Sequence, residues 1–376
     1  MPVTIDPFYA IQINLLAHEL KAQGRSVIHM EYGQPSAGAP RKAIEVAHRV
    51  LDSDSMGYWE STDLQHAMAR HYQQAYGLDL DPNRFVLTCG ASAALVLALT
   101  VRFDAGETVA MARPGYVAYR NTVKALHLQP HEIACDASTR YQLAAGHLEA
   151  LTPAPAGVIV ASPANPTGTI IPADELEKIA SVCRARAIGV ISDEIYHGLS
   201  YVEPAQTILR YDPDAFVVGS FSKYFGMPAW RLGWLLAPEA YVSRARAFVG
   251  NLFLTAPSLS QHAALAALDC HDELEERVLV YKRNRDLLLQ ALPRLGLDKI
   301  APPDGAFYIY AHIGHLTDDS LGFCKQLLLD TGVATAPGID FDPVDGHHYI
   351  RLSFAVTTEE TEDAIRRLET WFAARR

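Results

Sequence analysis

Short apolar runs alternate along this chain with polar turns and amphipathic stretches. Residues 84–88 form an apolar run that leads through the small residues 89–92 into the apolar stretch 93–99, a pattern typical of a strand, a tight turn and a buried helix. The same succession follows the later runs 108–112, 157–161, 189–192 and 215–219. Strands that alternate with helices predict an α/β fold with a mainly parallel sheet, and near-continuous apolar strands predict helices over both of its faces.

Side chains that can bind a ligand or take part in catalysis follow these predicted strands, each just past a strand end. They are Ser92, Tyr116, Asn165, Asp193, Tyr196, Ser220 and Lys223. Ligands of open α/β sheets sit beyond the carboxyl ends of the strands. We therefore expect these residues, although far apart in sequence, to gather at one edge of the sheet.

Lys223 is the most informative of them. It follows the apolar run 215–219 directly, within the segment Ser-Phe-Ser-Lys-Tyr-Phe-Gly at 220–226. A lysine at the end of a buried strand is costly unless it is neutralised, paired or covalently modified. A Schiff base with an aldehyde cofactor meets that requirement and gives the lysine a catalytic role.

Two further segments suit parts of such a cofactor. Gly90, Ala91 and Ser92 open a predicted helix, so their backbone N–H groups and the hydroxyl are available to a phosphate; an ordinary capped helix start fits the same residues. Asp193 at a strand end is suited to hold a ring nitrogen protonated, which lets the ring accept electrons. An ordinary turn start is the alternative for Asp193.

Four more residues fit both a ligand and a structural role. Asn165 belongs to a segment with the composition of a turn, and only its position after a predicted strand favours contact with a ligand. Tyr116 is suited to stack on a planar ring, or to pack in the core. Arg231 and Arg351 are each followed by apolar residues, which predicts partial burial. Buried arginines need anions, so phosphate and carboxylate binding stand beside structural ion pairing.

Composition narrows the class of protein. The net charge of −11 disfavours nucleic acid and anionic membranes as partners, and no apolar run reaches the ~18 residues of a membrane span. The N-terminus has acidic Asp6 and no basic segment before an apolar core, so we expect no secretory signal. Five scattered cysteines without CxxC spacing predict reduced thiols in a cytoplasmic protein, and 15 histidines without ligand spacing predict no metal site.

The order of four motifs supports a resemblance. Asn-Pro-Thr-Gly at 165–168, Asp-Glu-Ile-Tyr at 193–196, SxSKxxGxxxxRxGW at 220–234 and Arg-Leu-Ser-Phe at 351–354 occur in this order. The chain thus resembles, over nearly its whole length, the pyridoxal-phosphate enzymes of fold type I, specifically the class I/II aminotransferases. The resemblance implies a large domain with a mainly parallel, seven-stranded sheet at 41–270. It also implies a smaller α/β domain built from 1–40 and 271–376.

The resemblance also implies roles for residues at matching positions. Lys223 forms the Schiff base with pyridoxal 5'-phosphate and later moves the substrate proton. Asp193 pairs with the ring nitrogen, Tyr196 and Asn165 contact the ring hydroxyl, and Tyr116 stacks on the ring. Residues implied to hold the phosphate are Gly90, Ala91, Ser92, Ser220, Ser222 and Arg231.

Substrate and assembly follow in the same way. Arg351 and the Gly33 backbone are implied to receive the substrate carboxylate, with Asn165 beside them. Tyr58 resembles a tyrosine that reaches the partner subunit's phosphate, which implies a homodimer with shared active sites. The segment after Tyr58 departs from the family pattern, because it is shorter and has Gln65 in place of an arginine.

The implied activity is transfer of an amino group between an L-amino acid and a 2-oxo acid. None of the motifs contains an arginine positioned to bind a second carboxylate on the substrate side chain, so we expect a neutral or aromatic amino acid as substrate. A carbon–sulfur β-lyase or another elimination enzyme on the same fold is the main alternative. The sensory half of a transcription regulator and a catalytically silent homologue are weaker alternatives, since no basic DNA-binding domain is found and the motifs are otherwise intact.

Overall fold

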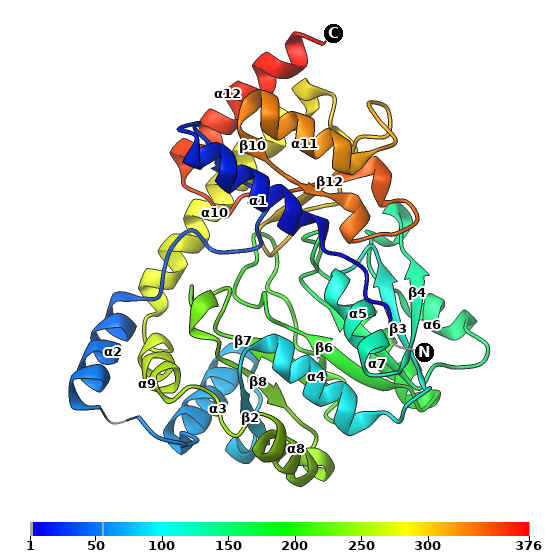
Figure 1. Ribbon diagram of the computed structural model, residues 1–376. Helices are drawn as coiled ribbons and strands as arrows, with labels where there is room; N and C mark the ends of the chain where they lie inside the picture. The colour runs from blue at the N-terminus through cyan, green and yellow to red at the C-terminus, as the bar shows by residue number, and fades with distance from the viewer. Residues whose placement is uncertain (1–2, 55, 376) are drawn as a thin grey trace.

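The computed structural model describes residues 3–54 and 56–375 and has a seven-stranded sheet at its centre (Figure 1). The strand order is β2-β8-β7-β6-β5-β3-β4. The strands are β2 (Phe85–Thr88), β3 (Thr108–Arg113), β4 (Gln129–Ala134), β5 (Gly157–Ala161), β6 (Gly189–Asp193), β7 (Phe216–Ser220) and β8 (Gly233–Leu236). All neighbouring strands pair in parallel except β8, which is antiparallel to both β2 and β7. The predicted α/β fold with a mainly parallel sheet is confirmed.

Helices cover both faces of this sheet. They are α3 (Thr62–Tyr76), α4 (Ala91–Arg102), α5 (Val117–Ala125), α6 (Ala145–Ala150), α7 (Ala173–Ala185) and α8 (Glu239–Leu252). Along β5, Val158 and Val160 pack into one hydrophobic cluster and Ile159 packs into another, because successive side chains of a strand point to opposite faces. Burial on both faces explains why β5 is apolar at every position, whereas the edge strand β4 is exposed or half-buried at most positions and includes polar residues.

Most of the remaining elements form a second layer of small sheets and helices. Strands β11 (Ala336–Pro337), β12 (Tyr349–Ser353) and β9 (Tyr308–His312) form an antiparallel sheet, and β1 (Ile28–His29) pairs in parallel with β10 (Val333–Ala334). The helices of this layer are α1 (Tyr9–Ala22), α10 (His271–Ala291), α11 (Ser320–Thr331) and α12 (Thr358–Ala373). Helix α2 (Arg41–Ser53) packs instead on α9 (Ser258–Ala267), which also contacts α3 beside the large sheet. Single turns of 3-10 helix occur at Pro82–Arg84, Ala137–Thr139, Ile208–Arg210, Pro228–Trp230, Leu292–Leu295, Gly338–Asp340 and Gly346–His348.

The two ends of the chain meet in this second layer. The β1–β10 pair and the contact of α1 with α11 bring the N-terminal segment against the C-terminal part (Figure 1). The expected division of the chain into domains at 41–270 and at 1–40 with 271–376 stays a prediction.

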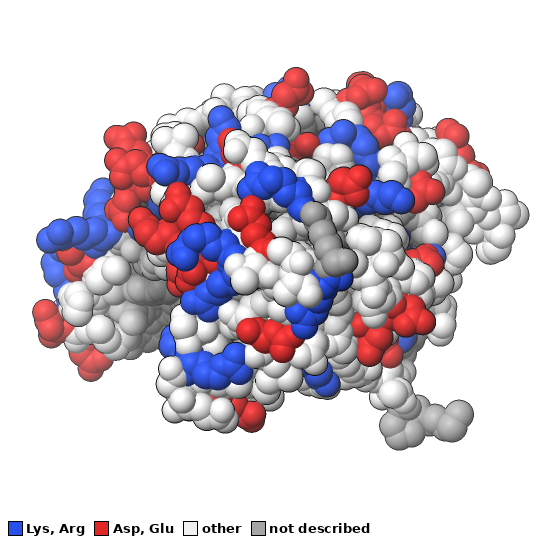
Figure 2. Space-filling model, turned by 90° about the horizontal axis from the view of Figure 1, so that it is seen from above, with Lys and Arg blue, Asp and Glu red and all other residues white. Residues whose placement is uncertain are grey.

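The surface charges, the cysteines and possible membrane-spanning or metal-binding features are relevant to the class of protein. Acidic and basic side chains are interspersed on the face seen in Figure 2 rather than gathered into a basic patch. All five cysteines have free thiols. Within residues 3–54 and 56–375, no helix is long and apolar enough to cross a bilayer, and no cluster of three or more metal-ligating side chains occurs.

Candidate active site

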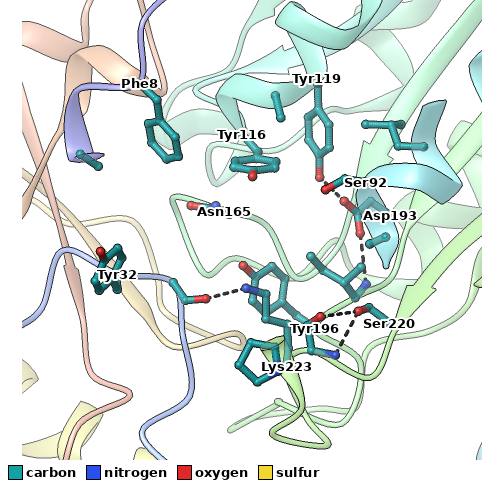
Figure 3. A pocket seen from close by; sticks show the side chains of 18 of the residues that line it. Phe8, Tyr32, Ser92, Tyr116, Tyr119, Asn165, Asp193, Tyr196, Ser220 and Lys223 are labelled. Atoms are coloured by element: carbon teal, nitrogen blue, oxygen red, sulfur yellow. Dashed lines mark hydrogen bonds between the residues drawn. The ribbon is translucent and has the colours of Figure 1, made fainter. Parts of the chain in front are cut away.

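A cavity of about 310 Å³ lies where the carboxyl ends of the parallel strands meet the second layer (Figure 3). Strands β5, β6 and β7 end at this edge, and the loops that follow them line the cavity. The predicted site residues that line it are Gly33, Ala91, Ser92, Tyr116, Asn165, Asp193, Tyr196, Ser220, Ser222, Lys223, Arg231 and Arg351. The structure therefore brings together residues that the sequence spreads over most of the chain.

One end of the cavity is suited to an anion. Helix α4 begins at Ala91 without a side-chain cap, so its N-terminal N–H groups face the cavity. Gly90 lies just behind the lining with φ 87°, and a Cβ there would overlap the Arg231 guanidinium. The Ser220 hydroxyl donates to the Ser222 hydroxyl at 2.8 Å and accepts from the Ser222 N–H at 3.0 Å.

Arg231 differs from its prediction. The sequence predicted partial burial, but the side chain is exposed, because the residue has the left-handed φ of 49° in a turn beside the cavity opening. Its Nη1 donates to the Pro228 carbonyl at 3.0 Å, and its guanidinium lies against Gly90 at the start of α4. An arginine and a helix N-terminus together form a binding site for phosphate.

Lys223 lies at the floor of the cavity. Its Nζ donates to the Gly33 carbonyl at 2.5 Å and lies 5.7 Å from the centre of the Tyr196 ring. Burial, followed by the nearby charge of Arg351, lowers the pKa of Lys223 to about 8, although Asp193 acts in the opposite direction. A lysine with a lowered pKa is more often a neutral amine, the form that attacks an aldehyde.

Asp193 is a buried carboxylate of the site. It is the last residue of β6, and it accepts hydrogen bonds from the Tyr119 hydroxyl at 2.6 Å and the Ile195 N–H at 3.2 Å. Burial raises the pKa of Asp193 to about 6, while both hydrogen bonds act to lower it. A buried carboxylate at a cavity wall is stabilised in its charged form by a cationic ligand group, such as a protonated ring nitrogen.

Arg351, in contrast to Arg231, is buried as predicted. Its guanidinium lies between two aromatic rings, 4.4 Å from the centre of Tyr308 and 4.7 Å from that of Phe341. Nη1 donates to Asn165 Oδ1 at 2.8 Å and Nη2 to the Glu31 carbonyl at 2.5 Å. Within the described residues its Nε has no hydrogen-bond partner, so this arginine is available to a carboxylate.

The three cations share a further property. Lys223, Arg231 and Arg351 each donate to neutral oxygen atoms, and no ion pair joins any of them to a carboxylate in the part of the chain that the structure describes. The cavity thus offers unpaired positive charge at two ends. The residues present fit a phosphorylated aromatic aldehyde, with the α4 end for its phosphate, Asp193 for its ring nitrogen and Lys223 for its aldehyde.

Two predicted residues do not line the cavity. Gly90 lies behind it, as described. Tyr58 is 87% exposed, in a loop where the neighbouring Trp59 stacks on His262 with ring centres 4.6 Å apart. Its role toward a partner subunit stays a prediction. Gln65 is buried and donates to Glu60 and to the Phe85 carbonyl.

Sequence reasoning missed several lining residues. Tyr119 lies three residues after Tyr116, so helical spacing was the available signal for it. Tyr308 also lines the cavity and was assigned no role from the sequence. Phe8 and Ile11 come from the N-terminal segment, and no local pattern marks them as part of a site.

Comparisons with known proteins agree with this geometry. The family model for aminotransferase class I and II matches residues 25–368. A valine–pyruvate aminotransferase of Mycobacterium tuberculosis is 44% identical over 374 residues, covering 98% of this chain and 96% of the relative. A (5-formylfuran-3-yl)methyl phosphate transaminase of Methanocaldococcus jannaschii is 29% identical, covering 98% and 97%.

Solved structures give the same result. An aminotransferase from Mycobacterium tuberculosis has a TM-score of 0.96 at 44% identity, covering 98% of this chain and 97% of its own. The aspartate aminotransferase of Thermus thermophilus with maleate has a TM-score of 0.90 at 28% identity, covering 97% of both chains. The elimination alternative is not favoured by these relatives. The chain belongs to the class I and II aminotransferases, enzymes that use pyridoxal phosphate to move an amino group between an amino acid and a 2-oxo acid.

Proposed function

We propose that the amino donor has a neutral, apolar side chain, with valine as the first candidate and pyruvate as a candidate acceptor. The cations of the cavity carry this proposal. Lys223, Arg231 and Arg351 are the lysines and arginines that line it within the described residues, and each is matched to the aldehyde, the phosphate or the α-carboxylate. No cation remains in this chain's cavity for a second substrate carboxylate. The 44% identical relative named valine–pyruvate aminotransferase supports the same choice.

Part of the cavity wall is apolar. Phe8 and Ile11 from the N-terminal segment and Tyr32 line it, and the Phe8 ring meets Tyr116 edge-to-face with centres 6.5 Å apart. An aliphatic side chain would gain by burial against these groups, at about 25 cal/mol per Å² of apolar surface removed from water.

This wall is anchored from both sides of the cavity. The Asp340 carboxylate accepts the N–H groups of Tyr9 and Ala10, both at 2.7 Å, where α1 begins. Asp6 forms ion pairs with Arg120 at 3.1 Å and Lys124 at 2.9 Å, both on α5. The N-terminal segment therefore bridges the second layer and the large sheet, which fixes the shape offered to the substrate side chain.

The proposed roles of the residues follow from their positions. Arg351, oriented by Asn165 and the Glu31 carbonyl, holds the substrate carboxylate, so that the Cα–H bond points toward Lys223. Lys223 takes this proton and returns it, in line with its lowered pKa. Pyridoxal phosphate, when bound, supplies an electron-accepting ring. Asp193 holds the ring nitrogen protonated and so preserves that capacity.

We also propose a homodimer and a cytoplasmic location. Apolar side chains are exposed on α2, on the loop before α3 and at or just after the end of α8, and they are Ile44, Leu51, Met56, Tyr58, Trp59, Leu252 and Leu254. An exposed apolar surface of this kind favours a second copy of the chain as its partner. Five free thiols support a reducing compartment.

The substrate proposal predicts a selective half-reaction. Each amino acid is added alone to purified holoenzyme, and conversion of the cofactor to its amine form is followed by absorbance. We expect conversion with valine and other neutral aliphatic amino acids, and slow or no conversion with aspartate and glutamate, whose second carboxylate meets no free cation. Faster conversion with aspartate than with valine would contradict the proposal.

The shared-site proposal predicts complementation between two inactive variants. Lys223→Ala removes the amine, and Tyr58→Ala removes a group proposed to reach the partner's site. A hybrid dimer of these chains contains one site with both residues intact, so co-expression restores about a quarter of wild-type activity per chain, since half of random dimers are hybrids. Mixtures that stay as inactive as the separate variants argue for sites built from one chain. Lys282→Ala, on the exposed side of α10, is the matched lysine control.

We expect the buried charge of Asp193 to lower the stability of the cofactor-free protein while it favours binding of the cofactor. The pKa of Asp193 is raised from 3.8 to about 6 by burial, so the folded state binds this proton more tightly than the unfolded state, and stability falls as pH rises from about 4 to 6. In cofactor-free enzyme at about pH 7.5, Asp193→Asn removes this cost and raises the free energy of unfolding by at most roughly 3 kcal/mol.

The measurement is thermal unfolding of both cofactor-free proteins at about pH 4.5 and about pH 7.5, with cofactor affinity determined in parallel. The stabilisation shrinks at the lower pH, where the wild-type carboxyl is protonated. The variant binds the cofactor more weakly at the higher pH. A variant that unfolds earlier than wild type at the higher pH contradicts this account.

A further inference from the structure

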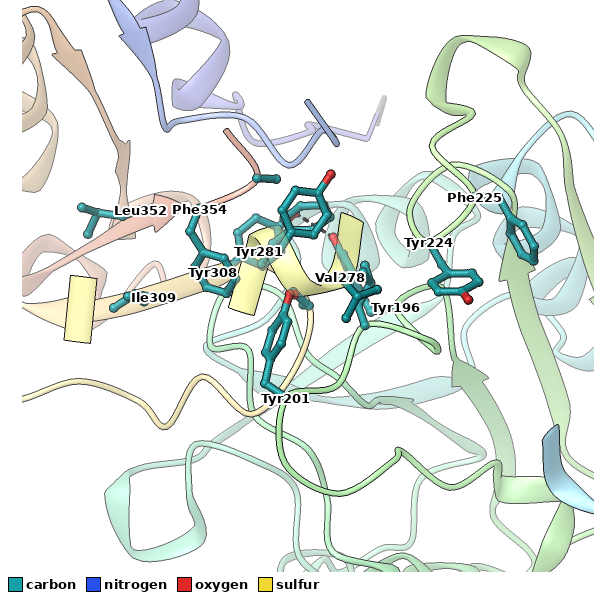
Figure 4. Close-up of a cluster of buried hydrophobic side chains, with 14 of the residues drawn as sticks. Tyr196, Tyr201, Tyr224, Phe225, Val278, Tyr281, Tyr308, Ile309, Leu352 and Phe354 are labelled. Carbon is teal, nitrogen blue, oxygen red and sulfur yellow. Dashed lines mark hydrogen bonds between the residues drawn. The ribbon is translucent and has the colours of Figure 1, made fainter. Parts of the chain in front are cut away.

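Tyr308 touches three groups of the site, yet none of the roles proposed above falls to it. It begins β9 and is fully buried, with its hydroxyl 2.7 Å from the Tyr196 hydroxyl (Figure 4). The centre of its ring lies 4.4 Å from the Arg351 guanidinium carbon. A Cβ at Gly33 would overlap the same hydroxyl, so this hydroxyl also lies against the segment whose carbonyl accepts from Lys223.

Only one of the two hydroxyl groups can donate the hydrogen bond between Tyr196 and Tyr308. Each phenol has a single O–H proton, so one hydroxyl of the pair donates and the other accepts. Burial raises the pKa of both Tyr196 and Tyr308 above its usual value, so both phenols stay neutral and keep their protons. If Tyr308 donates, the proton of Tyr196 is left free for a third oxygen atom in the cavity.

Tyr196 has no other fixed partner to set this direction. Within the described residues, its hydroxyl is bonded to Tyr308 alone. The charged and titratable groups around the pair are Arg351, Asp193, Lys223 and Tyr116. None of these holds the Tyr196 hydroxyl within hydrogen-bonding distance, so the orientation of that hydroxyl depends on Tyr308.

The Tyr308 ring and the Tyr308 hydroxyl have separable functions. The ring packs among Phe307 and Tyr196 and provides the face on which the Arg351 guanidinium lies. Phenylalanine would preserve that packing and the cation–π contact. The hydroxyl is not needed to fill the core, so its position against Tyr196 has a separate explanation.

We propose that Tyr308 is a positioning residue that links the two halves of the site. Its hydroxyl donates to Tyr196, which directs the Tyr196 proton toward the ring oxygen of the cofactor, and its ring holds Arg351 in place for the substrate carboxylate. This inference rests on the proposed roles of Tyr196 and Arg351. It adds that one side chain of β9 serves both.

The proposed role of the Tyr308 hydroxyl is tested with Tyr308→Phe. A hydrogen bond donated to the cofactor ring oxygen favours its anionic form and lowers the pKa at which the lysine-bound cofactor changes colour. Loss of the orienting hydroxyl weakens that bond, so the absorbance pKa of the holoenzyme rises by about 0.5 to 1 unit, the effect of roughly one hydrogen bond. In the Tyr196→Phe background, Tyr308→Phe produces no further shift.

The proposed role of the Tyr308 ring is tested with 3-methylbutanoate, a carboxylate that binds but has no amino group to react. Its dissociation constant, measured from the spectral change of the holoenzyme, stays within about twofold of wild type in Tyr308→Phe, because the cation–π contact is retained. In Tyr308→Leu it rises roughly three- to tenfold, because the guanidinium loses one of its two aromatic faces.

Tyr310 provides a matched control on the same strand. It lies two residues further along β9, is equally buried, and its hydroxyl has no partner among the described residues. Tyr310→Phe removes a buried hydroxyl of the same kind without touching the cavity, so neither the absorbance pKa nor the probe affinity changes.

The outcomes distinguish this inference from the proposed function. A normal absorbance pKa in Tyr308→Phe, together with a shifted one in Tyr196→Phe, overturns the proposal and leaves the role of Tyr196 intact. No shift in either variant removes the role of Tyr196 itself. If Tyr308→Leu binds the probe as tightly as wild type, the link to Arg351 is wrong, whatever the absorbance shows.

Discussion

The absence of counter-ions around the cavity's cations is the constraint on which this site depends. Among the described residues, Lys223, Arg231 and Arg351 are held by carbonyl and amide oxygen atoms rather than by carboxylates. Neutral dipoles orient a cation without cancelling its charge, so the charge remains available to a phosphate and a carboxylate. An internal ion pair would compete with each ligand, because the partner carboxylate would be left buried and unpaired when the ligand bound.

Asp193 completes this arrangement with the opposite sign. It is a buried carboxylate of the cavity wall, and it is bonded to Tyr119 and a backbone N–H rather than to a cation. Its raised pKa and the lowered pKa of Lys223 have the same first cause, which is burial. Burial therefore makes the charged form of each group less favourable in the empty site than in water. A cationic ring nitrogen beside Asp193 would offset that cost, so the filled site is more favourable than the empty one.

Sequence reasoning reached β2, β3, β5, β6 and β7 and the residues that follow them, because the apolar runs and turns are local signals. It predicted neither β8 nor the edge strand β4, whose residues are mostly exposed or half-buried. The antiparallel direction of β8 has no such signal, since residues 233–236 are apolar in either direction. Arg231 was expected to be partly buried because apolar residues follow it, but its side chain lines the cavity and is exposed there. Tyr308 contacts Tyr196, 112 residues away in sequence, and the Glu31 carbonyl accepts from Arg351, 320 residues away, so no pattern within a window of sequence identifies these contacts. The role of Tyr58 toward a second chain rests on the resemblance alone.

The N-terminal segment shows why such long-range contacts matter for function. The carbonyls that hold Arg351 and Lys223 belong to Glu31 and Gly33, just after β1. This segment is fixed by Met30, whose N–H donates to Ala334 and whose carbonyl accepts from Ser353, both near the other end of the chain. The cavity therefore acquires its geometry only after the two ends have docked on each other. Cofactor binding, which needs that geometry, then stabilises the docked state by mass action, so that folding of the second layer and formation of the site are one equilibrium.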